Sequence, residues 1–402
     1  MTDVAPVGPA AAWRVIRSRN FWPYFAGNAA SASGTWFQNL AGGILVFRLT
    51  HSAFLLGVLA FCQFAPVLLL APWAGSWADR LDRRLLIGVS QLVATLLSGS
   101  LAALAWAGDA RPWVVIACSG ALGVTTAISG PAQQALIASL VEEHDVAQAV
   151  ALNSMTFNLA RAIGPVSAAA VIATLGVPWA FALNSLSYLA LVAGLAAVRP
   201  RPQLRAARAS LWESVRLVRA EPRLAASLLI VMCVGFASDP VNTESPAFAH
   251  AFGYAETWSG AIVGLFGLGA VSAALLVAGR VSGTRGRMAV TLGLLSGGIV
   301  LFALTPWLPL AFVFLVVAGF GYLASNTAAT TRLQLGVAES HRGRVMALWS
   351  VAFLGLRPVA SLIDGTLAAT VGVRAAALAL ALPAGLGAIV VARGRPPRSG
   401  GG

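Results

Sequence analysis

Long runs of apolar residues, separated by short polar turns, make up most of the chain. Each run is long enough for a helix that crosses the hydrocarbon core of a bilayer, which takes about 20 residues. Pro, Gly and charged residues punctuate the runs and indicate tight turns. The pattern predicts twelve membrane-spanning helices, over residues 21–47, 54–77, 85–107, 112–138, 148–174, 178–198, 223–247, 258–279, 288–305, 309–334, 345–369 and 374–393.

The composition narrows the class of protein. Hydrophobic residues make up 58% of the chain and charged residues 10%, and the mean hydropathy is +0.80. A soluble domain carries about 25% charged residues, so we expect an all-α integral membrane protein. Residues 1–20 lack the apolar core of a cleavable signal peptide, and the three cysteines lie inside apolar runs. We therefore expect neither a removed leader nor a disulfide framework.

The distribution of charge predicts the orientation. The formal net charge is +13, and all 27 basic residues are Arg. They lie in short segments between apolar runs, which argues against nucleic-acid binding. With a cytoplasmic N-terminus, 22 arginines fall on the cytoplasmic side, three fall outside and two lie within helices. Cytoplasmic loops are enriched in Arg, so we expect a multi-pass protein of the cell (cytoplasmic or inner) membrane with both termini cytoplasmic.

One long connection, residues 199–222, divides six predicted helices from six. In this linker Ser210 and Glu213 have the spacing of a capping box, which predicts a short helix on the inner membrane face. A simple connector would explain the same segment. The expected parts are a cytoplasmic N-terminal segment (1–20), an N-terminal six-helix bundle (21–198), the cytoplasmic linker (199–222), a C-terminal six-helix bundle (223–393) and a cytoplasmic tail (394–402).

The two halves of the chain repeat one another at an offset of 196 residues. At this offset Glu143 meets Glu339 and Arg161 meets Arg357 without a gap. A charged residue at the bilayer centre costs about 2.5–3.5 kcal/mol, so two arginines in matching mid-helix positions are not an accident of low complexity. Two six-helix halves related by a parallel repeat are the plan of a large class of transporters. Both arginines are candidates for a buried structural or coupling role.

A charged segment follows the second predicted helix. From Gly75 to Arg84 it reads G-S-W-A-D-R-L-D-R-R. It resembles the signature of the major facilitator superfamily between helices 2 and 3, G-x-L-A-D-R-x-G-R-R/K. Trp77 and Asp82 stand at the two positions that depart from this signature. The resemblance implies the major facilitator fold, with twelve helices in two pseudo-symmetric halves.

The same resemblance implies a latch on the cytoplasmic side. Gly75 would let a neighbouring helix approach, and Asp79 would meet the N-terminus of helix 11, near residues 343–346, where a carboxylate is favoured. Arg83 would pair with an acid at the inner end of helix 4, which is Glu142, Glu143 or Asp145. Alternatively, the arginines only set the orientation. In the second half Gly283 stands where the Asp would be, so the latch is one-sided. Its expected members are Gly75, Asp79, Arg80, Arg83, Glu142 and Glu143.

A narrower resemblance runs along most of the chain. The stretches GTWFQNLAGGILVFRLTHSAFLLGVL, LNSMTFNLARAIGP, AFALNSLSYLA and RGRVMALWSVAFLGLRP are similar to the branch that contains the enterobactin exporter and related multidrug or macrolide efflux proteins. Those proteins are proton-driven exporters. Two departures concern the coupling: Ala168 and Ala169 replace the glycines of the antiporter motif on helix 5, and the Arg often found on helix 4 is missing.

In the resembled fold, helices 1, 4, 7 and 10 line a central cavity. Helix 1 carries a polar stripe that includes Asn28, Thr35 and Asn39 at helical spacing. Hydroxyls that bond to their own backbone offer another explanation, which suits Thr35. The candidate cavity residues are Asn28, Thr35, Asn39, Gln133, Asn242, Tyr322 and Asn326.

Helix 7 carries two acids beside prolines, Asp239 and Glu244. Proline disturbs the helix one turn back, and broken helices near the midplane mark transport sites. A carboxyl in a medium of low dielectric exchanges protons near neutral pH, so both acids are proton-coupling candidates. Alternatively, Asp239 is the permanent partner of Arg161 or Arg357, and Glu244 only faces outer water. We expect Asp364 at the outer interface.

These patterns favour one function over others. We expect proton-coupled export of an amphipathic small molecule, such as a drug or a siderophore, by alternating access. Uptake by a symporter or uniporter of the same fold, or a transport-inactive receptor, are the alternatives. The four histidines have no metal spacing, and neither a nucleophile turn nor a phosphate-binding loop occurs. We therefore expect no enzyme, metal or cofactor, and a monomer whose partners are its substrate, protons and lipid.

Overall fold

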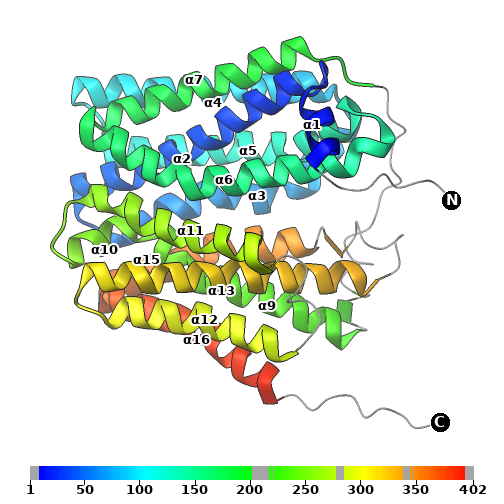
Figure 1. The fold of residues 1–402 in the computed structure, drawn as a ribbon. Helices are drawn as coiled ribbons and strands as arrows, with labels where there is room; N and C mark the ends of the chain where they lie inside the picture. The colour runs from blue at the N-terminus through cyan, green and yellow to red at the C-terminus, as the bar shows by residue number, and fades with distance from the viewer. Residues whose placement is uncertain are drawn as a thin grey trace, which may run out of the picture.

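A computed structural model describes residues 9–201, 216, 218, 219, 221–277, 285–337, 345, 346 and 348–393. Helices account for almost all of these residues, and no strand occurs among them. The helices lie side by side with roughly parallel axes, and the two halves of the chain form separate layers (Figure 1). The capping box at Ser210 and Glu213 and the tail 394–402 lie outside the described residues.

The first half of the chain forms one helical bundle. Its elements are α1 (Pro9–Ile16), α2 (Trp22–Thr50), α3 (Ala53–Arg80), α4 (Arg83–Ala107), α5 (Pro112–Leu140), the short η1 (Glu143–Asp145), α6 (Val146–Thr174) and α7 (Val177–Ala197).

The second half forms the other bundle. Its elements are α9 (Pro222–Thr243), α10 (Ser245–Ala251), the short η2 (Glu256–Trp258), α11 (Ser259–Val277), α12 (Arg285–Leu304), α13 (Leu308–Leu335), the π-helical η3 (Val351–Gly355), α15 (Arg357–Val371) and α16 (Val373–Arg393).

Eleven described helical segments are long and apolar enough to cross a membrane. The twelfth crossing is α2, whose 29 residues include the polar stripe of helix 1. The prediction of twelve helices in an all-α protein is confirmed, and most boundaries lie within a few residues of the expected ones. The main difference is on the seventh crossing, where the helix is interrupted at Glu244 and therefore consists of two helices, α9 and α10.

The two ends of the bundle differ. We call the end that carries the turns after α2, α4, α6, α10 and α15 the turn end, and the opposite end, where the N- and C-terminal parts lie, the terminal end (Figure 1). At the turn end four of these turns use glycine with positive φ, which glycine adopts without strain. The residues with positive φ are His51, Gly108, Gly176, Gly253 and Gly372.

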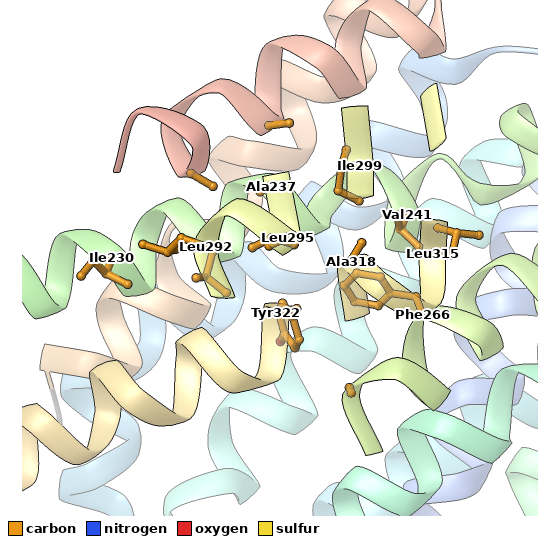
Figure 2. Close-up of a cluster of buried hydrophobic side chains, with 14 of the residues drawn as sticks. Ile230, Ala237, Val241, Phe266, Leu292, Leu295, Ile299, Leu315, Ala318 and Tyr322 are labelled. Carbon is orange, nitrogen blue, oxygen red and sulfur yellow. The ribbon is translucent and has the colours of Figure 1, made fainter. Parts of the chain in front are cut away.

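Each half has its own core. In the C-terminal half, side chains from α9, α11, α12 and α13 meet, and Tyr322 lies among them (Figure 2). The N-terminal half also buries apolar side chains, and it adds a polar network: the Ser98 hydroxyl donates to Gln38 Oε1 at 2.9 Å, and Asn184 Nδ2 lies 3.2 Å from the same oxygen. Buried polar groups are stable only when bonded, so this network holds α2, α4 and α7 in register.

The halves meet at the turn end. There α3 crosses α15 and α6 crosses α11, in both cases at small residues. A Cβ added to Gly57 would lie 2.5 Å from the Ser361 carbonyl oxygen and 2.9 Å from the Gly365 Cα. At the rim, Arg48 Nε lies 3.3 Å from Glu256 Oε2. This arrangement closes the space between the halves at the turn end.

Candidate functional site

An ion pair lies inside the C-terminal half. Its two residues are near the middle of the seventh and the eleventh membrane crossings. Arg357, the first residue of α15, places its Nε 3.9 Å from Asp239 Oδ1. The Ser361 hydroxyl donates to the same oxygen at 3.1 Å, and the Thr243 hydroxyl donates to Oδ2 at 3.1 Å. Asp239 is 1% exposed, so Arg357 and these two hydroxyls are the described groups that compensate its charge. Of the two arginines expected as partners, the structure selects Arg357.

The helix of the seventh crossing is interrupted close to the ion pair of Asp239 and Arg357. Helix α9 runs through Pro240 and ends at Thr243, and α10 starts at Ser245, with Pro246 in its first turn. Glu244 lies at the junction and is fully buried. The alternative that Glu244 only faces outer water is therefore wrong.

The two arginines of the repeat each reach the opposite half. Arg161 of α6 donates from Nη1 to the hydroxyl of Tyr322 on α13 at 2.6 Å, and its guanidinium stacks on that ring at 4.4 Å from the centroid. Arg357 stacks on Phe64 of α3 at 4.4 Å. A desolvated cation over an aromatic face is stabilised by about 2 kcal/mol. We call the two contacts between the halves, Arg161 with Tyr322 and Arg357 with Phe64, the arginine clasps.

A small cavity lies between the halves at this level. Its volume is about 60 Å³, which suffices for water molecules. Both halves line it with amides, and the aromatic rings come from the N-terminal half. The lining includes Trp36, Asn39, Gln63, Phe64, Asn242 and Arg357. Gln63 Nε2 donates to Asn39 Oδ1 at 2.6 Å.

A second hollow is apolar and larger. It has a volume of about 340 Å³ and lies between α2 and α6. Its walls come from Phe25, Phe37, Met155, Leu159 and Ile163. Pockets for small organic ligands start at about 300 Å³, so this hollow is large enough for the apolar part of such a molecule.

Of the seven candidate cavity residues, Asn39 and Asn242 line the cavity between the halves. Four of the other five make contacts inside their own half or in a clasp. Asn28 donates to Asn153 at 2.8 Å, Thr35 to the Ser31 carbonyl at 2.9 Å, and Gln133 to Ser129 at 3.1 Å. Asn326 does not line this cavity, and Tyr322, 1% exposed, belongs to the core and to the Arg161 clasp.

The charged segment after α3 lies at the terminal end. Arg83 donates to the carbonyls of Ala78 at 3.2 Å and Ala135 at 3.4 Å, which joins α3 to the end of α5. Asp79 and Arg80 are exposed. An added Cβ on Gly75 would meet no described atom within 4 Å, so no described helix makes the close approach expected there.

The residues expected to complete the latch lie partly outside the described chain. Residues 343 and 344, where Asp79 is expected to meet helix 11, are not described. Glu142 contacts Arg201 at 3.4 Å and His144 at 3.6 Å, and Glu143 starts η1. Nearby, Asp145 accepts a hydrogen bond from Arg14, which raises the pKa of that guanidinium and ties α1 to the bundle.

The sequence analysis did not predict the structural roles of two acidic residues. Asp82, which departs from the superfamily signature, caps α4 by accepting from the Leu85 N–H at 3.1 Å; a cap spacing before an apolar run is the signal that could have revealed it. Asp364 was expected at the outer interface, but it is 0% exposed. Position along a helix does not say which face a residue occupies, so no sequence signal placed it inside.

Residues 10–399 match the family of transmembrane secretion effectors. The chain belongs to this family of the major facilitator superfamily. It is 30% identical over 166 residues to the staphyloferrin A transporter of Staphylococcus aureus. This alignment covers 41% of the present chain and 42% of that protein. It is 26% identical over 185 residues to an uncharacterised transporter of the superfamily from Sinorhizobium fredii, over 43% and 45% of the two chains. The matches span less than half the length of these relatives.

Solved structures share the fold. A bacterial homologue of the human lysosomal transporter Spinster, in an inward-facing and occupied conformation, has a TM-score of 0.74 at 14% identity and covers 94% of this chain and 97% of its own. A bacterial homologue of the iron transporter ferroportin, in an inward-facing state, has a TM-score of 0.68 at 16% identity, over 93% and 99%. These structures show the fold, and the family match makes the chain a multi-pass membrane protein of the major facilitator superfamily.

Proposed function

We propose that this transporter is a proton-coupled exporter of an amphipathic small molecule that works by alternating access. The observation that carries the proposal is the ion pair of Asp239 and Arg357, which lies at the edge of the cavity between the halves. A titratable carboxyl at that place links proton binding to the contact between the halves.

The linkage runs through Arg357. Its guanidinium faces Asp239 on one side and the Phe64 ring of the opposite half on the other. A proton on Asp239 would remove the charge that holds Arg357, because a neutral carboxyl attracts a cation far less. The Phe64 clasp would then loosen. One proton that moves down 100 mV supplies about 2.3 kcal/mol, which is comparable to the stabilisation of one clasp.

The arginine distribution supports the membrane orientation on which the proposed direction of transport rests. If the arginine-rich terminal end is cytoplasmic, the closed turn end faces outward. The structure would then be an inward-facing state, ready to take substrate from the cytoplasm. In the opposite state the latch of Gly75, Asp79, Arg80, Arg83, Glu142 and Glu143 would close the terminal end.

The walls of the two hollows favour an amphipathic substrate. The apolar hollow between α2 and α6 suits a hydrophobic portion, and the amides of Asn39, Gln63 and Asn242 suit polar groups. The similarity to a staphyloferrin A transporter adds siderophores to the substrate classes worth testing, beside lipophilic drugs.

The test is substrate-driven proton movement in proteoliposomes that contain the full-length protein. The panel holds lipophilic cations, macrolides and siderophores. We expect one class to drive proton release, and Asp239→Asn to abolish the signal while it retains substrate binding. Asp109→Asn, at an exposed acid of the turn end, is the matched control and should behave as wild type. A signal that survives in Asp239→Asn would contradict the role of Asp239, and transport without proton movement would contradict the coupling.

A further inference from the structure

Two buried acids remain outside the ion pair. Glu244 lies at the junction of α9 and α10, and Asp364 lies on α15; both are 0% exposed. No described residue gives a hydrogen bond to any of their four carboxyl oxygens. Asp239 differs from both, since it receives two hydroxyl hydrogen bonds and faces Arg357.

Each of the two carboxyls is within electrostatic range of another acid. Glu244 is within electrostatic range of Asp364 and Asp239, and Asp364 is within range of Asp239. Like charges at close range in a medium of low dielectric disfavour a second ionisation. An unbonded carboxylate is also poorly tolerated in such a medium. A fully buried carboxyl that receives no hydrogen bond from any described residue is therefore suited to hold a proton.

The arginines on the neighbouring helices α16 and α2 interact with groups other than Glu244 and Asp364. On α16, Arg374 donates to the carbonyls of Ala303 and Thr305 and stacks on Phe252. On α2, Arg48 pairs with Glu256 of η2.

The remaining titratable groups near the pair are also accounted for. On α10, His250 packs against the rings of Phe47 and His51. On α15, Arg357 faces Asp239. Helices α3 and α11 carry no charged residue at the turn end. The described surroundings thus supply no counter-ion to Glu244 or Asp364.

The pair adjoins both the cavity and the closed crossing. Asn242, Thr243 and Ser245, on either side of Glu244 in the chain, line the cavity between the halves. Asp364 precedes Gly365, which packs against Gly57 where α15 crosses α3. Asp364 thus lies one residue from the contact that closes the turn end.

We propose that Glu244 and Asp364 form a second proton-binding site, a carboxyl pair that holds at least one proton inside the C-terminal half. A carboxylate oxygen of the pair takes its proton from water when the turn end opens. The proton leaves through Asp239 to water in the cavity when the turn end is closed. This inference rests on the proposed proton coupling, to which it adds Asp364 and a route.

The experiment measures the proton directly and needs no transport substrate. Infrared difference spectra of the full-length protein in liposomes are recorded across a pH series, in light and heavy water. We expect a carbonyl band of protonated carboxyl groups at neutral pH, with an isotope shift. Glu244→Gln and Asp364→Asn, both close in shape to the native residue, should each lose intensity in this band. The exposed-acid variant Asp109→Asn should keep the wild-type band.

Two results would overturn the proposal. One is a band of unchanged intensity in both Glu244→Gln and Asp364→Asn, with the variants folded as judged by their thermal unfolding. The other is a band that sodium removes at constant pH, which would make the pair a cation site. The infrared band is measured without transport. If the proposed export function fails, the evidence for the carboxyl pair therefore remains valid. If the band is absent, the transport assay can still support proton-coupled export.

Discussion

At the residue scale, the two intramembrane arginines illustrate how a costly charge is retained. Each lies at a matching position of the repeat, and each is covered by an aromatic ring of the opposite half. Arg357 also has Asp239, whereas Arg161 has the Tyr322 hydroxyl. Since the arginines bridge the halves, their contacts must break and re-form if the halves rock against each other.

Removal of the Arg161 clasp should weaken the inter-half contact. We expect Arg161→Gln to lower thermal stability in detergent, and Tyr322→Phe to lower it less, because the ring face remains. A double-mutant cycle should return a coupling energy of about 0.5–3 kcal/mol. Arg111→Gln, at an exposed end of α5, should have no effect. Additive effects of the two clasp variants would contradict a direct interaction.

The polar network of the N-terminal half offers a second residue-scale prediction. Asn184→Leu would leave Gln38 Oε1 and Ser98 with one partner fewer in an apolar core, at a cost of about 1–3 kcal/mol. Thermal unfolding in detergent measures the loss. The comparison variant is Ser272→Ala, since that exposed hydroxyl bonds only to a carbonyl of its own helix. Equal melting temperatures for the two variants would refute the network's role.

At the element scale, close helix crossings join the two halves at the turn end. Small residues let α3 approach α15 with backbone in contact, and α6 approaches α11 in the same way, with Gly260 against Pro165 and Ala169. Close packing of this kind is the main source of helix association in a bilayer, where lipid offers helices no hydrophobic gain. The crossings therefore act as the seal of the turn end.

A methyl group at the crossing should open that seal. We expect Gly57→Ala to shift the population toward a state open at the turn end, because its Cβ would meet backbone atoms of α15 at 2.5 and 2.9 Å. The distance between spin labels at Thr174 and Trp258, one in each half, measures the shift by double electron–electron resonance. Gly88→Ala, which meets open space, is the control. Identical distance distributions in the two variants would rule out the seal.

At the scale of the whole molecule, two rigid halves and one closed end define what the protein can do. Each half has a continuous core of its own, and the contacts between halves are few and specific. An arrangement of this kind can exchange one closed end for the other without unfolding either half. The rim pair of Arg48 and Glu256 lies where that exchange would be largest.

A covalent link at the rim should arrest transport. In a variant without native cysteines, Arg48→Cys and Glu256→Cys joined by a bifunctional thiol reagent should hold the turn end closed and abolish transport in proteoliposomes. Each single variant treated with the same reagent should transport as before. Full activity of the cross-linked protein would refute alternating access through this end.

The orientation can be tested on the same background. Asp109→Cys, at the turn end, should react with an impermeant maleimide in intact cells, because the arginine-poor end faces outward. Leu81→Cys, at the terminal end and 54% exposed, should react only after the membrane is permeabilised. The reverse pattern would place both termini outside.

The sequence by itself determined the helices, their number, the repeat and the superfamily. These follow from local properties: the length of an apolar run, the residues that interrupt it, and a motif with fixed spacing. Even the paired arginines were visible, because their cost makes them stand out from an apolar background.

Only the tertiary structure decided which side chains meet. It paired Arg357, not Arg161, with Asp239, moved Tyr322 from the cavity into the core, and buried Glu244 and Asp364. The reason is that a membrane helix is apolar on nearly all of its faces, so its periodicity does not tell which face turns inward. Helix rotation and the docking of the two halves are set by close packing between distant segments, and no local pattern records that packing.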